Sequence, residues 1–383
     1  MTQTNASGEG QRAVYLSIGV LAWNEERNIA RTLESLFQQS LFERLSQRGL
    51  IAQVFCVANG CTDRTVQIAA EVFEAQSRQH PFARSFECHV VDIRERGKYN
   101  AWNVFVHRES APEAQVLMLM DADILIDRPN TLANMVSALE ENPPAFVTTD
   151  QPRKHFASKA KKSPAEWLSM RMADMTQAAD GQLCGQLYCI RSGVARRIYL
   201  PKDIGAIEDG FIKAVVCTEF LTRETTPTRI IRAPDATHTF EAYTTLRAVL
   251  KNQKRQMIGQ TVVHILVDKY LRTLSIPDRL NLARTVQELE RDDPLWVKRL
   301  IAEHLERTRF FWRLIPGLAS LRFRRLARLR GMQRIACFPA AVAGCLLSMV
   351  SCFLARAALV KGQTQYWPHA KSGFVAGKGV TGG

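Results

Sequence analysis

The chain has no acidic residue after Glu306, although it runs to residue 383. Residues 307–383 hold nine Arg up to Arg334 and four further cations, which are Arg356, Lys361, Lys371 and Lys378. This segment supplies +13 of the net charge of +14, so the first 306 residues carry only +1. A balanced body with a cationic end predicts a polyanionic partner for that end, either lipid headgroups or nucleic acid.

Paired cysteine spacing is also missing. None of the nine cysteines forms a Cys-x-x-Cys pair, their number is odd, and several lie inside apolar runs. This argues against a disulfide framework and a zinc site, and we expect reduced, buried thiols. Residues 1–12 are small and polar, without the apolar core of a signal peptide. We therefore expect a disordered lead-in, followed by a folded part that stays in the cytoplasm.

Apolar runs that contain Val and Ile alternate with segments of helical spacing over the first 150 residues. The predicted strands are 13–22, 51–58, 86–93 and 114–120, and the predicted helices are 24–42, 63–76 and 98–108. This alternation is typical of an α/β fold whose mostly parallel sheet is covered by helices on both faces. Because such sheets bind ligands at the C-terminal ends of their strands, the candidate site residues follow these strands.

The pattern changes after residue 150. Further strands are predicted at 185–191 and 228–240, and further helices at 164–180, from Glu208, and from about Tyr243 to Trp312. We expect an α/β domain over 13–240, a helical region over 241–334, an apolar segment over 335–360 and a flexible tail over 361–383.

Two carboxylates, Asp121 and Asp123, follow the apolar run 116–120. Carboxylates placed so close repel each other unless a cation lies between them, and hard divalent ions such as Mg²⁺ or Mn²⁺ prefer oxygen ligands. The alternative is a plain strand-end turn with a helix cap.

Other predicted strand ends also carry polar groups, among them Glu25, Asn59 and Lys98. Asn59-Gly60 alone is also a common tight turn. A later acidic pair, Glu208-Asp209, opens a helix, where acids also complement the helix dipole.

In this order the motifs resemble those of the family 2 glycosyltransferases, which have the A-type glycosyltransferase (GT-A) fold and transfer sugar from a nucleotide donor. The matching segments are Ala22-Trp23-Asn24-Glu25, Asn59-Gly60-Cys61-Thr62-Asp63-Arg64-Thr65, Gly97-Lys98 with Ala101-Trp102-Asn103, Asp121-Ala122-Asp123 and Glu208-Asp209. They extend over roughly residues 14–240, so the resemblance covers the predicted α/β domain.

The resemblance implies a role for each matching position. Asp123 would coordinate Mg²⁺ or Mn²⁺, and Asp121 would contact the ribose of the donor, or the metal through water. Asp209, beside Glu208, would be the general base that takes a proton from the acceptor hydroxyl, and a direct displacement would invert the anomeric carbon. The expected nucleotide-sugar pocket consists of Glu25, Asn59, Asp63, Lys98, Asp121 and Arg255, and the expected acceptor side of Gly185 and Arg191.

Arg255 lies in a degenerate form of the Gln-x-x-Arg-Trp motif of processive members, with Asn252 and Gln256 at the Gln and Trp positions. These departures argue against a processive polymerase. Arg255 either contacts the diphosphate or belongs to a solvated basic helix face. His238 either reaches the metal or is structural, and a structural role is expected. Trp23 and Trp102 are expected to pack in the core rather than stack on a base.

Residues 335–354 contain no charge over 20 positions, roughly the length that crosses a bilayer core. Directly before them, 321–334 places Arg beside Leu and Phe, as in an interfacial amphipathic helix. The uncharged segment favours an anionic membrane surface over nucleic acid as the partner. It either spans the membrane, re-enters it or packs as a core helix, and the preceding Arg would keep that side cytoplasmic.

The leading hypothesis is therefore an inverting, metal-assisted glycosyltransferase on the cytoplasmic face of a membrane. It would move a sugar from a nucleotide-diphosphate sugar to a hydroxyl of a lipid-linked or glycan acceptor. The alternatives are a non-catalytic nucleotide-sugar-binding scaffold of the same fold and a cytosolic protein whose basic tail binds nucleic acid.

Overall fold

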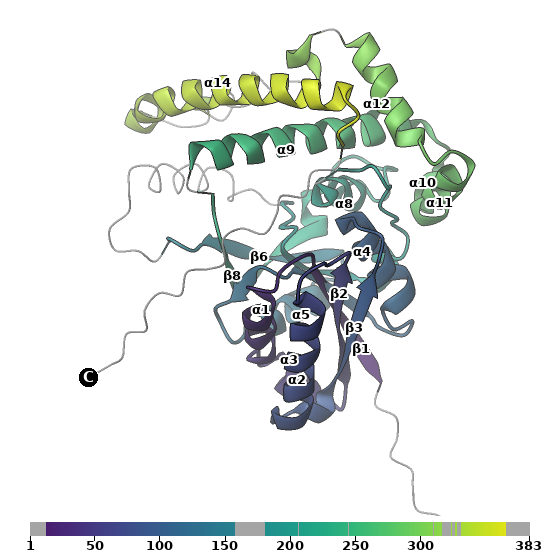
Figure 1. Ribbon diagram of the computed structural model, residues 1–383, viewed down its shortest axis with the longest axis vertical. Helices are drawn as coiled ribbons and strands as arrows, with labels where there is room; N and C mark the ends of the chain where they lie inside the picture. The colour runs from purple at the N-terminus through teal and green to yellow at the C-terminus, as the bar shows by residue number, and fades with distance from the viewer. Residues whose placement is uncertain are drawn as a thin grey trace, which may run out of the picture.

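The computed structural model describes residues 13–157, 181–205, 207–243, 245–308, 310–315, 323, 326–327 and 331–364. The predicted lead-in 1–12, the predicted helix 164–180, most of 321–330 and most of the predicted tail lie outside these residues. An α/β domain forms one part of the molecule, and a layer of long helices covers one side of it (Figure 1). The described strands form one eight-stranded sheet in the order β3-β2-β1-β4-β7-β6-β8-β5.

The first half of the sheet is parallel. Its strands are β1 (Val14–Ala22), β2 (Ile51–Asn59), β3 (Phe86–Ile93) and β4 (Val116–Asp121), and its helices are α1 (Ile29–Phe37), α2 (Leu41–Gln47), α3 (Thr65–Gln79) and α4 (Lys98–Val104). The predicted strands are confirmed to within two residues. The single helix predicted over 24–42 is wrong, because the chain turns between α1 and α2, where the amide of Ser40 donates to the carbonyl of Pro129.

The second half of the sheet mixes directions. It contains β5 (Ile124–Ile126), α5 (Thr131–Glu141), β6 (Val147–Lys154), β7 (Leu187–Arg191), α7 (Ser192–Ala195), α8 (Glu208–Cys217) and β8 (Ile230–Phe240). Strand β7 runs antiparallel to both β4 and β6, whereas β6 and β8 are parallel. The sheet as a whole is therefore mostly parallel but not purely so.

Both faces of the sheet are buried, as the apolar strands predict. In β4, Leu117 and Leu119 face a core shared with α4, α8 and the helical layer. Met118 and Met120 face a second core, shared with α1 and α5. Because neighbouring residues of a strand point to opposite faces, the uninterrupted apolar run of β4 can serve both cores.

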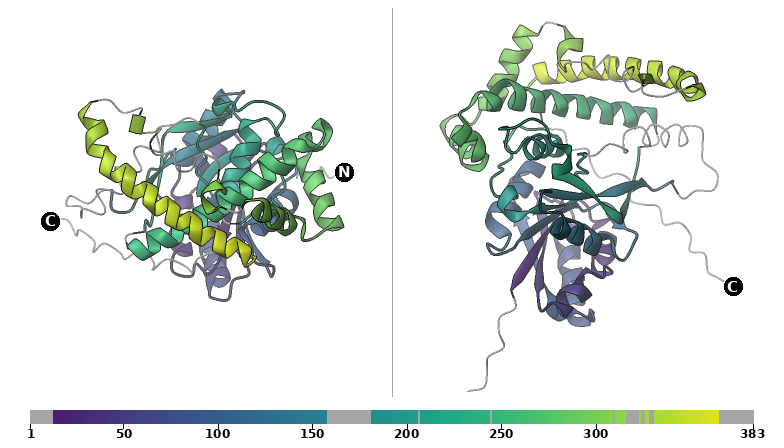
Figure 2. Two further views of the ribbon diagram at one scale, coloured as in Figure 1. Left: turned by 90° about the horizontal axis from the view of Figure 1, so that it is seen from above. Right: turned by 180° about the vertical axis from the view of Figure 1, so that it is seen from behind.

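The helical layer consists of α9 (Leu246–His264), α10 (Ile276–Leu280), α11 (Leu282–Asp292), α12 (Trp296–Arg307) and α14 (Met332–Val360). Helix α9 lies next to α8, and α14 lies along α9 on the side that faces away from the sheet (Figure 2). The apolar segment predicted over 335–360 is thus part of one long helix packed on the α/β domain through α9.

Within the described part of the chain, no helix combines the length and the apolar character needed to cross a membrane. The full membrane span, one of the three alternatives for residues 335–354, is therefore not supported.

Candidate active site

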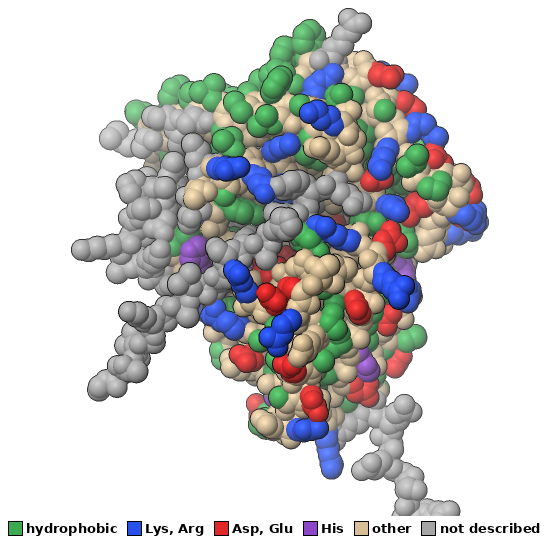
Figure 3. Space-filling model, viewed as in Figure 1, with side chains coloured by type: hydrophobic (Ala, Val, Ile, Leu, Met, Phe, Trp, Pro, Cys, Tyr) green, Lys and Arg blue, Asp and Glu red, His purple; other side chains and the backbone are tan. Residues whose placement is uncertain are grey.

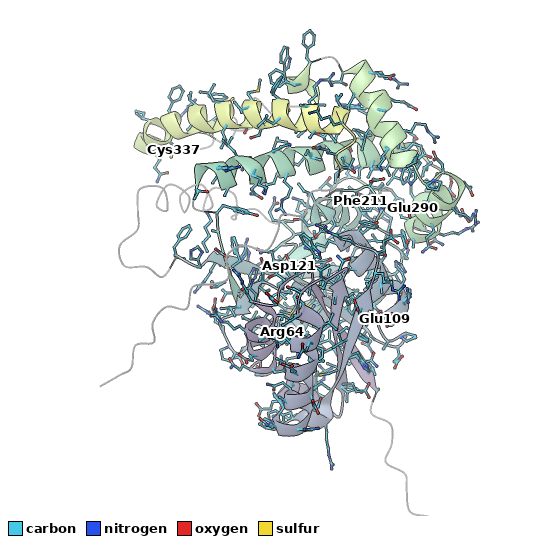
Figure 4. All side chains as sticks on the ribbon, in the orientation of Figure 1. Arg64, Glu109, Asp121, Phe211, Glu290 and Cys337 are labelled. Atoms are coloured by element: carbon cyan, nitrogen blue, oxygen red, sulfur yellow. The ribbon has the colours of Figure 1, made fainter. Side chains whose placement is uncertain are left out.

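The candidate site lies at the edge of the sheet where β1, β2 and β4 end. These strands are parallel and in register, with Ala22 beside Ala58 and Leu21 beside Asp121. Their C-terminal residues are therefore brought to one edge, as the sequence predicts. Figure 4 shows Asp121 in the middle of the molecule, below Phe211 of α8.

The loops after β1 and β2 are bound to each other. Asn24, in the left-handed region with φ of 53°, accepts a hydrogen bond at Oδ1 from the amide of Thr62 at 2.8 Å. The amide of Glu25 donates to Thr65 Oγ1 at 2.8 Å, and Asn28 Nδ2 donates to Glu25 Oε2 at 2.7 Å. These contacts hold Glu25 at the sheet edge between the starts of α1 and α3.

Asp63 also helps to hold the loops after β1 and β2 together. Its Oδ1 accepts from the amide of Thr65 at 3.0 Å, and its Oδ2 accepts from the amide of Glu26 at 3.1 Å. Both carboxylate oxygens are therefore engaged by backbone groups, one at the start of α3 and one in the loop after β1. Its predicted contact with the nucleotide remains a prediction.

Asn59, the last residue of β2, is buried beneath the loop that follows β3. Its Oδ1 accepts from the amide of Gly97 at 2.8 Å, while its Nδ2 is buried and has no hydrogen-bond partner among the described residues. A buried amide donor without a partner costs free energy unless a ligand supplies an acceptor. The side chain is thus suited to contact a polar ligand such as a nucleobase.

Lys98, at the start of α4, connects the two acidic motifs. Its Nζ lies 2.6 Å from Asp121 Oδ1 and 2.7 Å from Glu208 Oε1, and it also donates to the carbonyl of Gly185 at 3.4 Å. Desolvation acts to lower the pKa of Lys98, but the charges of Asp121 and Glu208 outweigh it and raise that pKa well above its ordinary value. The ammonium group therefore stays charged and neutralises carboxylates from two distant segments.

Asp121 ends β4, and its amide donates to the carbonyl of Gln186 at 2.8 Å. Burial raises the pKa of its carboxyl to about 6, although the charge of Lys98 opposes the rise and that of Asp123 adds to it. Asp123 lies two residues further, in the turn between β4 and β5, and is half-buried. The two carboxylates thus occupy the strand end expected from the Asp-x-Asp motif.

Asp209, the second residue of α8, closes the site from the side of the helical layer. Its Oδ1 accepts from the amide of Gly210 at 2.8 Å. Burial, followed by the charge of Glu208, raises the pKa of its carboxyl to about 6. A carboxyl with a raised pKa is a better proton acceptor than an ordinary aspartate, which is what a general base near neutral pH requires.

Gly185 lies directly against Asp209. A Cβ at position 185 would be 2.8 Å from Asp209 Cβ and 3.1 Å from its Oδ2, so only glycine fits without displacing the carboxylate. The structure therefore brings Gly185 to the proposed base, close to where an acceptor hydroxyl would have to approach.

Arg255 reaches the same region from α9. Its charge lowers the pKa of Asp209, and its guanidinium is half-buried, with Nη2 donating to Asn252 Oδ1 at 3.1 Å. Its Nε is buried and has no hydrogen-bond partner within the described residues. Of the two alternatives for Arg255, the solvated helix face fits these observations less well than a position in the site.

Arg191 is the one predicted site residue that lies elsewhere. It is at the C-terminal end of β7, opposite Val116 at the start of β4, and thus at the other edge of the sheet. Its guanidinium donates to the carbonyls of Ala145 at 2.8 Å and Leu139 at 2.7 Å. It satisfies carbonyl groups at the end of α5, so we assign it a structural role in place of the predicted acceptor contact.

Asp121 and Asp123 fit the divalent ion that the motif implies. Mg²⁺ and Mn²⁺ at phosphate-transfer sites are held by one or two carboxylates plus oxygens of the substrate, and not by a full cage of protein ligands. Among the described residues, neither aspartate belongs to a group of three or more close ligand side chains. The site would then need the diphosphate of the donor to complete the coordination.

One group of three potential metal ligands does occur in the described residues, namely Asp150, Cys184 and His238. His238 is fully buried, and its Nδ1 lies 2.6 Å from Asp150 Oδ2. Asp150 belongs to β6, a strand that the sequence analysis did not predict. The available signal was the run Phe146-Val147-Thr148-Thr149, which is rich in apolar and β-branched residues, although Asp150 lies within β6 and not at its end.

Both tryptophans of the predicted site are packing residues, as expected. Trp102 is buried, and its Nε1 donates to the hydroxyl of Tyr188 at 2.8 Å. Trp23 is also buried, and the guanidinium of Arg96 lies over its ring, 3.7 Å from the centroid.

Comparison with known proteins identifies the α/β domain. The family model described as "Glycosyl transferase family 2" matches residues 17–199. TarS 1–349 from S. aureus is 14% identical, with a TM-score of 0.45 over 91% of this chain and 92% of that chain. Glucosyl-3-phosphoglycerate synthase from Mycobacterium tuberculosis, in complex with Mn²⁺, UDP-glucose and phosphoglyceric acid, is 13% identical, with a TM-score of 0.41 over 64% of this chain and 78% of that chain. No curated protein sequence matches.

Proposed function

Residues 17–199 belong to glycosyl transferase family 2, and from this premise we propose that the protein moves a sugar from a nucleotide-diphosphate sugar to a hydroxyl group of an acceptor. The observation that carries the proposal is the position of Lys98 between Asp121 and Glu208, with Asp209 next in the chain. This arrangement joins the strand end that would receive the donor to the helix that carries the base.

In the proposed reaction, Asp209 accepts the proton of the acceptor hydroxyl. The acceptor oxygen then forms a bond to the anomeric carbon, while the bond from that carbon to the diphosphate oxygen breaks and the diphosphate leaves with the electron pair. A single displacement of this kind inverts the anomeric configuration. Gly185 supports this assignment, since its lack of a side chain leaves the Asp209 carboxylate undisplaced.

Asp123, with Asp121, would hold Mg²⁺ or Mn²⁺ when the donor is bound. The ion would neutralise the charge that develops on the leaving diphosphate. Lys98 and Arg255 would add positive charge near the same group, and Asn59 Nδ2 would donate to the nucleotide. For the acceptor, we propose a hydroxyl of a lipid-linked or glycan molecule at the cytoplasmic face of a membrane, for which the cationic segment 307–383 is the support.

Binding of the donor nucleotide can be tested by thermal denaturation. We expect one nucleoside diphosphate, out of a panel of UDP, GDP, ADP and dTDP, to raise Tm in the presence of Mn²⁺. A nucleotide concentration of about 100 times Kd would stabilise the fold by about 2.7 kcal/mol, which corresponds to a rise in Tm of several degrees. We expect Asp123→Ala to remove the Mn²⁺-dependent part of the shift, and Asp292→Ala, at an exposed aspartate, to keep it. If none of the four nucleotides raises Tm, the proposal that the donor is a nucleotide-diphosphate sugar is contradicted.

The rate of sugar transfer should also depend on pH. Asp209 acts as a base only when it is ionised, and its pKa of about 6 means that the protonated form dominates below that pH. We therefore expect kcat/KM to be level above about pH 7 and to fall about tenfold per pH unit well below pH 6. The measurement is a pH profile of kcat/KM from donor and acceptor turnover, and a profile that stays level down to pH 5 would exclude Asp209 as the base.

A further inference from the structure

Helix α14 exposes a row of large apolar side chains, which we call the apolar face. Its members are Ile335, Phe338, Leu346, Val350, Phe353 and Leu354, with exposed fractions between 38% and 72%. Most of the intervals between them are multiples of three or four residues, so they lie along one side of the helix. Single exposed apolar residues are common on soluble proteins, but a row of this length marks a surface that another apolar phase covers.

Aromatic residues before α14 extend the apolar face. Phe311 packs edge-on against Phe353 with ring centroids 5.7 Å apart, and Cys352 Sγ donates to its carbonyl at 2.9 Å. Phe310 and Trp312 stack on each other at 4.7 Å and are 49% and 43% exposed. Figure 3 shows hydrophobic side chains gathered along the edge of the molecule over α14, away from the α/β domain.

The opposite side of α14 is already covered by protein. The residues Ser348, Ser351, Cys352, Ala355, Ala358 and Leu359 are buried, and α14 lies along α9. With 29 residues, α14 is about 44 Å long. The helix is therefore held lengthwise on the domain through α9 (Figure 2). Its apolar face is the exposed side.

We propose that the apolar face docks on the surface of an anionic lipid bilayer, with α14 lying in the plane of the membrane. The charge of the surrounding sequence selects this partner. Residues 321–334 contain six Arg, Arg334 and Lys361 at the two ends of α14 are exposed, and the chain has no acid after Glu306. A helix with an apolar side and cationic flanks lies at the boundary between lipid headgroups and acyl chains.

A second copy of the chain fits this surface less well. Two copies that met through their apolar faces would bring the exposed Arg334 and Lys361 of both chains to one interface, and like charges repel. Nucleic acid would satisfy the arginines, but the phosphate backbone offers nothing to cover Leu346 or Val350. This inference rests on the proposed membrane location and specifies the protein surface that would contact the membrane. Because its test uses no sugar transfer, its failure would leave the proposed reaction standing.

The test is flotation of the full-length protein with lipid vesicles. We expect binding to phosphatidylcholine vesicles that contain about one third phosphatidylglycerol, and much weaker binding to phosphatidylcholine alone. The double variant Leu346→Gln/Val350→Gln should bind the anionic vesicles about tenfold more weakly, because it removes two inserting side chains without altering charge. The matched control is Ile276→Gln/Leu295→Gln, which replaces apolar residues that are 55% and 58% exposed outside α14. It should bind like the unmodified protein.

Several outcomes would overturn the inference. If the unmodified protein does not float with anionic vesicles at low salt, the partner is not a lipid surface. If the α14 double variant floats as well as the control, the arginines alone bind the lipid and the apolar face has no part. If light scattering shows a dimer that the α14 double variant converts to a monomer, the face covers a second copy instead. The replaced side chains are exposed, so circular dichroism and Tm should show that both variants fold.

Discussion

The substitution Asp209→Asn is expected to lower sugar transfer by about 10²–10⁴-fold while leaving the fold intact. Asn has the same shape as Asp and can still accept the hydrogen bond from the amide of Gly210, but it cannot take up a proton from the acceptor. The loss should therefore fall on kcat and not on the affinity for the donor nucleotide. The measurement is steady-state turnover together with nucleotide binding by calorimetry.

The stability of the Asp209→Asn variant separates a catalytic role from a structural one. Ionised Asp209 lies beside Glu208 in a buried site, and its pKa is raised to about 6 in the folded state. A carboxyl whose pKa is higher in the folded state than in the unfolded state lowers stability as pH rises through that range. Removal of this charge should leave Tm at pH 8 unchanged or higher.

Asp278→Asn is a suitable control for Asp209→Asn, because Asp278 lies in the first turn of α10 and is exposed. We expect it to retain full turnover. Two results would count against Asp209 as the base. One is an Asp209→Asn enzyme that keeps more than about one tenth of its turnover, and the other is a loss of turnover that comes with a matching loss of stability.

The second large effect is expected for Lys98→Met. This substitution keeps most of the side-chain volume but leaves Asp121 and Glu208 without the cation that now lies 2.6 Å and 2.7 Å from them. Removal of one partner from a buried ion pair costs about 3–5 kcal/mol, because the remaining charges are uncompensated. We expect a loss of stability of that order at pH 8, measured by urea denaturation, together with the loss of donor binding.

The pH dependence of the Lys98→Met effect follows from the sign of the pKa changes. Burial already raises the pKa of Asp121, and the charge of Lys98 opposes this rise, so without Lys98 its carboxyl group should titrate at higher pH in the folded state than in the unfolded state. Protonation then favours the folded state, so the loss of stability should be smaller at pH 5 than at pH 8. Equal losses at both pH values would show that packing, and not charge, is what Lys98 supplies.

Lys202→Met is the matched control, since Lys202 is 54% exposed and its Nζ lies 3.2 Å from Glu95. An exposed ion pair contributes little, and we expect a change below about 1 kcal/mol. Denaturation curves of the two variants, compared at both pH values, isolate the effect of burying the cation between two carboxylates. If Lys98→Met costs no more than Lys202→Met, the link between the acidic motifs is not important for the fold.

The parallel half of the sheet was predictable because it consists of local patterns. The runs at β1, β2, β3 and β4 are apolar and bounded by polar turns, so each could be read without the rest of the chain. Strand β6 was not predicted, because Pro152 and charged Arg153 and Lys154 interrupt the pattern of a buried strand. Its pairing with β7 and β8 outweighs these weak local preferences.

The candidate site also contains residues whose positions were predictable from the sequence and residues whose positions were not. Asn59, Lys98 and Asp121 were predictable as neighbours, because the ends of parallel strands meet at one edge. Gly185 and Arg191 were placed together from the sequence, yet they lie at opposite ends of β7, and the antiparallel pairing of β7 with β4 decides which end is at the site. Gly185, before the strand, is brought to the site, while Arg191, at its end, is carried to the far edge. A single apolar run does not indicate whether its strand will pair parallel or antiparallel to its neighbour.

The sequence by itself determined the family, the strand ends that carry polar groups, and the separation of a balanced body from a cationic end, because each depends on residues close together in the chain. The tertiary structure decided that Lys98 joins Asp121 to Glu208, which are 87 residues apart. It also decided that α14 packs along α9 and exposes its other side. Both outcomes depend on which distant segments share the same space, and composition alone does not specify this.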